Sequence, residues 1–419
     1  MKYTSFDDIE VNSEWSFTNI RSTEQWTHGY HRYPAKFLPN VVKKLIETYA
    51  INTGTIADVF AGCGTTLVEA KAHGIKSVGI DINPVAQLIT KAKIKPVLPD
   101  VMNVEYKKLV TSFSQYDANE CKNIELHDRI DYWFRPEEKK KIAFLYGKIL
   151  SLNQDDVRNF FLVCLSHILK NCSRWLMSGT KPQIDPNKTP AEPFQTFQFH
   201  CKKMMAKNHL FYTELEKNNY LDILCEIKLA DARETQIRAN SIDTIITSPP
   251  YVTSYEYADI HQLTAYWYEY ISNLSEFRKN FIGTFYSLNQ HTNCKSKRAQ
   301  QIVNDLLKKD DRTAKEVANY FNDMEVVGKE MYRIVKKNGY VCIVIGNTTV
   351  KDVKINSAEI FFEILKSAGF KKEDVIKRSI PNKLMPTIRD KNTGRFTKLS
   401  NPNSKLVYPD EFIIIVKKK

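Results

Sequence analysis

One apolar run that ends in a glycine-rich turn constrains the fold of this chain more than any other segment. Residues 55–66 read as a strand that runs into a turn containing Gly62 and Gly64, and a helical stretch follows. Glycines let the backbone turn tightly and approach a ligand, while the start of the helix presents free N–H groups. A second strand, residues 77–80, then ends on Asp81. These features predict an α/β sheet with a ligand site at the carboxyl ends of its strands.

The details of this turn favour a nucleoside ligand without a pyrophosphate. Asp81 lies 19 residues after Gly62, where a Rossmann-type unit places the acid that binds ribose hydroxyls. Leu67 stands where the dinucleotide fingerprint has its third glycine, and the Gly-Lys-Ser/Thr ending of a phosphate-binding loop does not occur.

A second motif, Thr247 to Tyr251, follows the apolar stretch 242–246 and reads Thr-Ser-Pro-Pro-Tyr. Consecutive prolines cannot continue a strand ladder, so the chain must turn out at the carboxyl end of this strand. The turn offers the hydroxyl of Ser248, proline-stiffened carbonyls and an aromatic ring. Such a set can hold a planar base that carries an exocyclic amine. Taken alone, the motif is also compatible with an ordinary Pro-Pro turn and a packed tyrosine.

In this order, residues 58–66 (DVFAGCGTT) and 247–251 (TSPPY) resemble the paired signatures of S-adenosylmethionine-dependent DNA amino-methyltransferases. The serine form of the second motif resembles the cytosine-N4 branch, whereas adenine-N6 enzymes more often carry Asp or Asn there. Upstream, residues 31–39 resemble the segment that closes over the methionine end of the cofactor. The resemblance covers residues 28–95 and 223–419. It implies an α/β, Rossmann-like class I methyltransferase fold, with a seven-stranded, mostly parallel sheet, an antiparallel last strand and helices on both faces.

The resemblance also implies roles for individual residues. Ser248 and the Pro249 carbonyl would accept hydrogen bonds from the target amine, and Tyr251 would stack on a base flipped out of the duplex. The expected catalytic residues are Ser248, Pro249, Pro250 and Tyr251.

For the cofactor, S-adenosyl-L-methionine, the resemblance implies that Asp81 binds the ribose, Asp231 accepts the adenine amine and Asp58 lies near the methionine amino group. Lys36 and its neighbours would cover the methionine. The expected cofactor-binding residues are Tyr33, Pro34, Ala35, Lys36, Asp58, Phe60, Gly62, Gly64, Thr65, Thr66, Asp81, Ile82, Asn83 and Asp231.

The charge of the chain favours an anionic partner. Its formal net charge is +13, with a pI near 9.1, which suits nucleic acid better than membrane. Residues 277–298 contain basic and aromatic side chains and no acid, and residues 381–409 contain one acid, Asp390. Both segments are expected to contact DNA, although solvated loops would have the same composition. The expected DNA-binding residues are Arg278, Lys279, Lys297, Arg298, Lys383, Arg389, Lys391 and Arg395.

Between the two halves of the α/β pattern, the sequence becomes helical. Residues 1–95 and 223–419 are expected to form the catalytic domain, and residues 96–222 a helical insertion that could recognise the DNA target. In the second half, the pattern predicts helices at 257–273, 311–336 and 358–368.

Other classes of protein are disfavoured. The eight cysteines include no Cys-x-x-Cys pair, so we expect neither a disulfide framework nor a zinc site, and no metal. The amino terminus does not resemble a signal peptide and the apolar runs are too short to span a membrane, so a cytoplasmic protein is expected.

The expected function is therefore methylation of cytosine N4 in double-stranded DNA by a restriction–modification system, whose nuclease could be a separate chain. Adenine-N6 methylation is the nearest alternative, because the same turn can hold either amine. Guanine-N2 methylation of RNA and a non-catalytic DNA-binding subunit are more distant ones.

Overall fold

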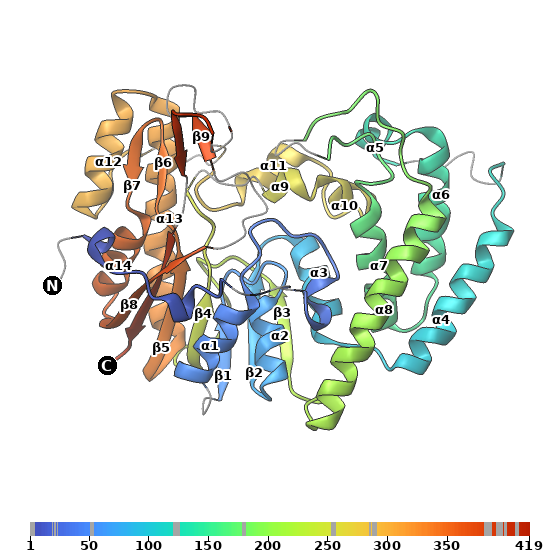
Figure 1. Ribbon diagram of the computed structural model, residues 1–419, viewed down its shortest axis with the longest axis horizontal. Helices are drawn as coiled ribbons and strands as arrows, with labels where there is room; N and C mark the ends of the chain where they lie inside the picture. The colour runs from blue at the N-terminus through green and yellow to red at the C-terminus, as the bar shows by residue number, and fades with distance from the viewer. Residues whose placement is uncertain are drawn as a thin grey trace.

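The computed structural model describes residues 5–419 apart from 19, 21, 23, 51–53, 120–125, 178–181, 253–256, 285, 287–290, 381–387, 391–396, 398–399 and 407–409. At its centre lies a seven-stranded sheet with the order β3-β2-β1-β4-β5-β11-β8 (Figure 1). The strands from β3 to β5 run parallel, and β11 is antiparallel to both β5 and β8. This confirms the predicted methyltransferase sheet. The strand bounds are β1 Thr55–Asp58, β2 Lys76–Asp81, β3 Cys225–Leu229, β4 Ile242–Thr247, β5 Val335–Ile345, β8 Lys371–Ser379 and β11 Asp410–Lys417.

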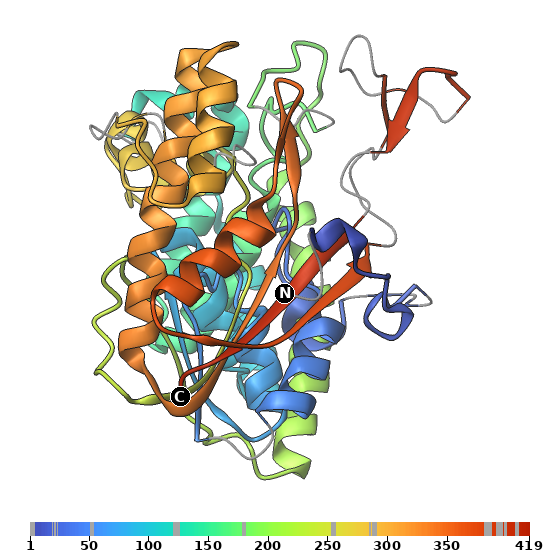
Figure 2. The ribbon, with the colours of Figure 1, turned by 90° about the vertical axis from the view of Figure 1, so that its left-hand side faces the viewer.

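Helices cover both faces of the sheet, because successive strand residues point to opposite sides. Ile56 and Ile246 pack against α1 (Pro39–Tyr49), whereas Ala57 and Ile245 belong to the core beneath α13. Figure 2, seen from one end of the sheet, shows α1 and α13 on opposite sides of it. The other long helices of the α/β part of the chain are α2 Thr65–Ala72, α3 Pro84–Ile94, α12 Lys297–Leu307, α13 Asp311–Ile334 and α14 Ser357–Ser367.

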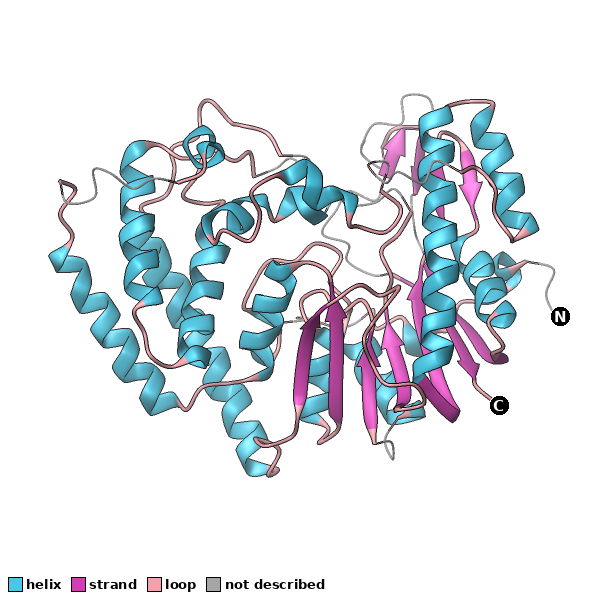
Figure 3. Ribbon diagram, turned by 180° about the vertical axis from the view of Figure 1, so that it is seen from behind, coloured by secondary structure: helices cyan, strands magenta, loops and turns pink. Residues whose placement is uncertain are grey.

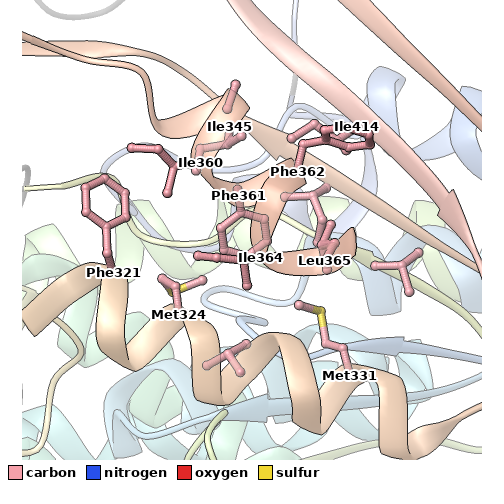
Figure 4. Packing of buried hydrophobic residues seen from close by; sticks show 14 of the residues in the cluster. Phe321, Met324, Met331, Ile345, Ile360, Phe361, Phe362, Ile364, Leu365 and Ile414 are labelled. Carbon is pink, nitrogen blue, oxygen red and sulfur yellow. The ribbon is translucent and has the colours of Figure 1, made fainter. Parts of the chain in front are cut away.

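The long helix α13 confirms the helix predicted over 311–336. The apolar residues that recur on one face of this helix at a spacing of three or four, from Val317 to Ile334, are buried. Phe321, Met324 and Met331 point toward Phe361 and Ile364 of α14 (Figure 4). This packing anchors the helix whose first half faces the site described below.

A group of helices lies beside the sheet, in the segment between β2 and β3 in the sequence (Figures 1 and 3). Its helices are α4 Pro99–Thr111, α5 Asp128–Trp133, α6 Pro136–Leu150, α7 Asp155–Ile168 and α8 Pro193–Lys217. Their apolar side chains share one core with Val85, Leu88 and Ile89 of α3. The group is therefore packed onto the sheet layer through α3. No described helix is both long and apolar enough to cross a membrane.

The prediction of one helix over 257–273 is wrong. Two short helices, α9 (Tyr257–Ile260) and α10 (Gln262–Trp267), occupy its first part, and α11 (Leu274–Lys279) follows. The chain leaves α10 because Glu269 adopts φ 55°, and the Tyr270 N–H then bonds the Ala265 carbonyl at 2.9 Å. This pattern closes the helix end.

Two hairpins lie outside the main sheet. They pair β6 (Thr348–Val350) with β7 (Val353–Ile355) and β9 (Ile388–Asp390) with β10 (Ser404–Leu406). The remaining short elements are single 3₁₀ turns at η1 Phe6–Asp8, η2 Ser13–Trp15, η3 Trp26–Gly29 and η4 Ser112–Gln115.

Candidate active site

A cavity of about 330 Å³ opens where the strands β1 to β4 end, as expected for a doubly wound sheet. It brings together most of the residues predicted from the sequence. Those that line it are Tyr33, Ala35, Lys36, Asp58, Phe60, Gly62, Thr65, Asp81, Ile82, Asn83, Asp231, Ser248, Pro250 and Tyr251. The predicted residues Pro34, Gly64, Thr66 and Pro249 do not line it.

Two carboxylates line the cavity, Asp58, which is buried, and Asp81, which is partly buried. Asp81 accepts hydrogen bonds from the Gly62 and Asn83 N–H groups, both at 2.8 Å. One oxygen of Asp58 accepts from the Thr247 hydroxyl at 2.5 Å and from the Phe60 N–H at 3.1 Å. Burial raises the pKa of each carboxyl to about 6. Both groups lack a basic partner among these hydrogen bonds, so a bound donor would be their natural complement.

The two glycines of the turn have different structural roles. Both have positive φ, 49° at Gly62 and 76° at Gly64. A Cβ on Gly62 would meet the Tyr33 ring at 3.3 Å, at the wall of the cavity. A Cβ on Gly64 would instead lie 2.6 Å from Thr90 of α3, and the Thr90 hydroxyl bonds the Gly62 carbonyl at 3.0 Å. Gly64 therefore shapes the turn from behind, and its predicted contact with the cofactor stays a prediction.

We expect Gly64→Ala to lower the free energy of unfolding by at least about 2 kcal/mol. The left-handed backbone costs roughly 1–2 kcal/mol and the contact with Thr90 adds a similar amount. Chemical denaturation measures the loss. Gly147→Ala is the control, because its Cβ would meet nothing within 4 Å in the last turn of α6, and it should stabilise slightly. Equal stability of Gly64→Ala and the wild-type protein would contradict the steric argument.

The Pro-Pro turn is held from three sides. The Ser248 hydroxyl donates to the Val344 carbonyl at 3.0 Å, at the end of β5. The Tyr251 hydroxyl donates to Glu411 of β11 at 2.9 Å, and Tyr320 of α13 donates to the Pro250 carbonyl at 2.8 Å. The turn is therefore a rigid feature of the cavity wall.

Asp231 lies at the end of β3, as predicted, but it has a partner that the sequence did not indicate. Both of its carboxylate oxygens bond the Arg233 guanidinium, at 2.6 to 3.0 Å. Arg233 also bonds Asp323 of α13 at 2.9 Å and the Asn280 carbonyl at 3.0 Å. These contacts fix Asn280, which lines the same cavity as Asp58. A carboxylate in such a pair keeps lone pairs for a further donor.

Sequence reasoning missed one wall of the cavity. Residues 280–284, Tyr257, Glu316 and Tyr320 line it, and none belongs to a recognised motif. Glu316 and Tyr320 lie one turn apart on α13 and therefore share a face. Burial raises the pKa of Glu316, and the Arg312 guanidinium lies 3.4 Å from its carboxylate. In the sequence, only the spacing of Glu316 and Tyr320 on the predicted helix 311–336 indicated that they share a face.

Of the predicted DNA-binding residues, Arg278, Lys279, Lys297 and Arg298 do not line the cavity. Three of them form ion pairs, Arg278 with Asp259, Lys279 with Glu276 and Arg298 with Glu363. Lys297 is exposed at the start of α12, and Arg389 lies in β9. Lys383, Lys391 and Arg395 lie outside the described residues.

As for metals, the described part of the chain contains no group of three or more His, Cys, Asp or Glu side chains arranged to bind one.

The sequence is similar to those of known DNA methyltransferases. A family model described as DNA methylase, for N6 and N4 methyltransferases, matches residues 2–92 and 242–419. The Type II methyltransferase M.MvaI of Kocuria varians is 29% identical, with 90% of this chain and 89% of the relative covered. M.MjaII of Methanocaldococcus jannaschii is 23% identical, over 58% of this chain and 62% of the relative. A solved SAM-dependent methyltransferase from Methanosarcina mazei has a TM-score of 0.32 at 10% identity, covering 93% of this chain and 98% of its own. Since the family model matches more than half of the chain, this protein belongs to the DNA amino-methyltransferase family.

Proposed function

We propose that this protein transfers a methyl group from S-adenosylmethionine to the N4 amine of a cytosine flipped out of duplex DNA. The observation that carries the proposal is the hydrogen bond from the Ser248 hydroxyl to the Val344 carbonyl, in a turn that lines the same cavity as Asp58 and Asp81. Relatives named Type II methyltransferases support a role as the modification component of a restriction–modification system.

The methyl donor is S-adenosylmethionine, which supplies an activated methyl group on a sulfonium. Asp81 accepts the ribose hydroxyls, because its carboxylate lies at the end of β2 beside the glycine turn. Asp58 faces the methionine ammonium, which provides the positive partner that this buried carboxylate lacks. Asp231 accepts the adenine amine, and Lys36 covers the methionine end. The protein's task is then to align the amine and to manage one proton.

Ser248 acts on the nucleophile as a hydrogen-bond acceptor. A hydroxyl has one proton, and that of Ser248 is directed to the Val344 carbonyl. The oxygen therefore presents lone pairs to an incoming N–H. A hydrogen bond from the cytosine amine to this oxygen localises the nitrogen lone pair that is otherwise delocalised into the ring. The Pro249 carbonyl, which the resemblance implies as a second acceptor, does not line the cavity, so the proposal rests on the Ser248 oxygen.

Tyr251 offers the face on which the flipped base stacks. Its ring lies against Gly346, where a Cβ would come within 3.0 Å of it, and its hydroxyl is tied to Glu411. The ring is thus held in place before a base arrives. Stacking on an aromatic side chain offsets part of the cost of unstacking a base, which is a few kcal/mol.

The test is the chemical identity of the product. Duplex DNA treated with the protein and S-adenosylmethionine is digested to nucleosides and analysed by mass spectrometry, and we expect N4-methylcytosine. N6-methyladenine would overturn the cytosine branch and retain the mechanism, since the family model covers both amines. Absence of any methylated base from DNA of varied sequence, by a protein that binds the cofactor, would overturn the function.

A further inference from the structure

Three basic side chains differ from Arg278, Lys279 and Arg298, because they have no carboxylate partner within the described part of the chain. We call Arg32, Lys170 and Lys188 the basic cluster. Within the described residues, no carboxylate oxygen lies within 4.0 Å of any of the three charged groups. The predicted residues Arg278 and Arg298, by contrast, each bond a carboxylate.

Neutral groups hold the basic cluster together. Arg32 donates to the side-chain oxygen of Asn171 at 3.1 Å. Lys188 donates to the carbonyls of Lys170 and Trp175 at 2.6 and 2.9 Å, and the Lys170 ammonium lies 4.5 Å from the centre of the Trp175 ring. Carbonyls and an aromatic face orient these cations without cancelling their charge.

The cluster is electrostatically unfavourable without an anion. Burial, together with the charge of Arg32, lowers the pKa of Lys170 to about 8. Burial and Arg32 also lower the pKa of Lys188, although Cys172 and Asp185 partly offset this. Like charges kept together at such a cost are typical of a site that binds an anion.

The position of the cluster suits a DNA backbone. Arg32 directly precedes Tyr33, which lines the cavity. Lys170 and Lys188 belong to the segment between α7 and α8, which rises on the side of the molecule where β1 and β2 end (Figures 1 and 3). Close by, the His31 ring bonds Ser166 of α7 at 2.9 Å, and Ser166 bonds Thr264 of α10 at 2.7 Å. The cluster is therefore fixed relative to the site.

We propose that the basic cluster binds backbone phosphates of the substrate DNA next to the target base. This inference rests on the proposed function and extends it, because it assigns a phosphate site to the place where Arg32 contacts the segment between α7 and α8. Arg and Lys held in this way position a duplex without reading its sequence.

The test is the salt dependence of DNA binding by the double variant Arg32→Gln, Lys170→Gln. If each residue contacts one phosphate, the slope of log K against log salt should fall by about 1.8 on duplex DNA. Affinity at about 0.1 M salt should fall tenfold or more. The charge-matched control is Lys108→Gln, Arg158→Gln, whose side chains pair with Glu105 and Asp155, and its slope should equal that of the wild-type protein.

Because Arg32 belongs to the segment 31–39 that we expect to close over the methionine, the cofactor control uses Lys170→Gln alone, and calorimetry with S-adenosylmethionine should give it the affinity of the wild-type protein. If the double variant folds poorly, the exposed Arg32→Gln alone should still lower the slope by about 0.9. Unchanged slopes in folded variants of an enzyme that methylates DNA would overturn the phosphate site and leave the function intact. A wild-type protein that methylates no DNA would overturn the function, whatever the slopes.

Discussion

Replacing Ser248 with alanine is expected to lower kcat roughly a hundredfold or more, the usual effect of removing one group that stabilises developing charge at a reacting atom. In the proposed mechanism the hydroxyl oxygen accepts a hydrogen bond from the target amine, and this hydrogen bond strengthens as the nitrogen becomes cationic. The affinity for S-adenosylmethionine should stay within about twofold, because Ser248 acts on the base and not on the cofactor. Single-turnover methylation and calorimetry measure the two quantities separately.

A cysteine or threonine at 248 would change size as well as chemistry, so Ser248→Gly serves as the second variant. It also removes the hydroxyl and should match Ser248→Ala in rate. The loss of the bond to the Val344 carbonyl is shared by both. Full activity in both variants would show that the hydroxyl does not act on the amine.

Asp58→Asn is expected to weaken cofactor binding while stabilising the unliganded protein. A hydrogen bond to a charged group contributes about 1.5–3 kcal/mol, so affinity for S-adenosylmethionine should fall about 10- to 100-fold. Asparagine can still accept from the Thr247 hydroxyl and the Phe60 N–H through its oxygen. Removing the buried charge also lowers the pKa of Asp81, which the Asp58 carboxylate raises.

The pH dependence of stability shows whether Asp58→Asn should stabilise or destabilise the protein. Burial raises the pKa of Asp58 from 3.8 to about 6, so the folded protein is penalised for its charged form. The penalty is absent below pH 3.8, grows as the pH rises, and reaches about 3 kcal/mol above pH 6. Asp58→Asn should therefore be more stable than the wild-type protein at pH 8 and similar to it near pH 4. Thermal unfolding without cofactor measures this. Asp352→Asn, exposed in the β6–β7 turn, is the charge-matched control and should show no such difference.

The parts of the site that could be predicted from the sequence are those encoded by short local motifs. The glycine turn, Asp81 and the Ser248 turn each follow an apolar strand, so their place at the strand ends follows from the α/β pattern alone. The apolar stripe of α13 likewise identified its buried face.

Other features depend on contacts that no local pattern encodes. Glu316 reaches the cavity only because α13 packs across the sheet, and Arg278 is neutralised by Asp259, 19 residues away. The β6–β7 hairpin escaped prediction because Lys351 and Asp352 adopt positive φ, where Asn-Gly would have been the usual signal. In the same way, composition identified the basic segments but not which of their charges stay unpaired.

The position of β11 has a consequence for how the molecule is assembled. β11 enters between β5 and β8, and its Glu411 anchors the hydroxyl of Tyr251, 160 residues earlier in the chain. β1 and β2, by contrast, pair directly with each other, with Thr55 opposite Lys76, 21 residues later. Contacts between distant segments form late, because the loop between them must close first. During synthesis β1 and β2 can therefore pair first, and the hydroxyl of Tyr251 is fixed only after the last strand has been inserted.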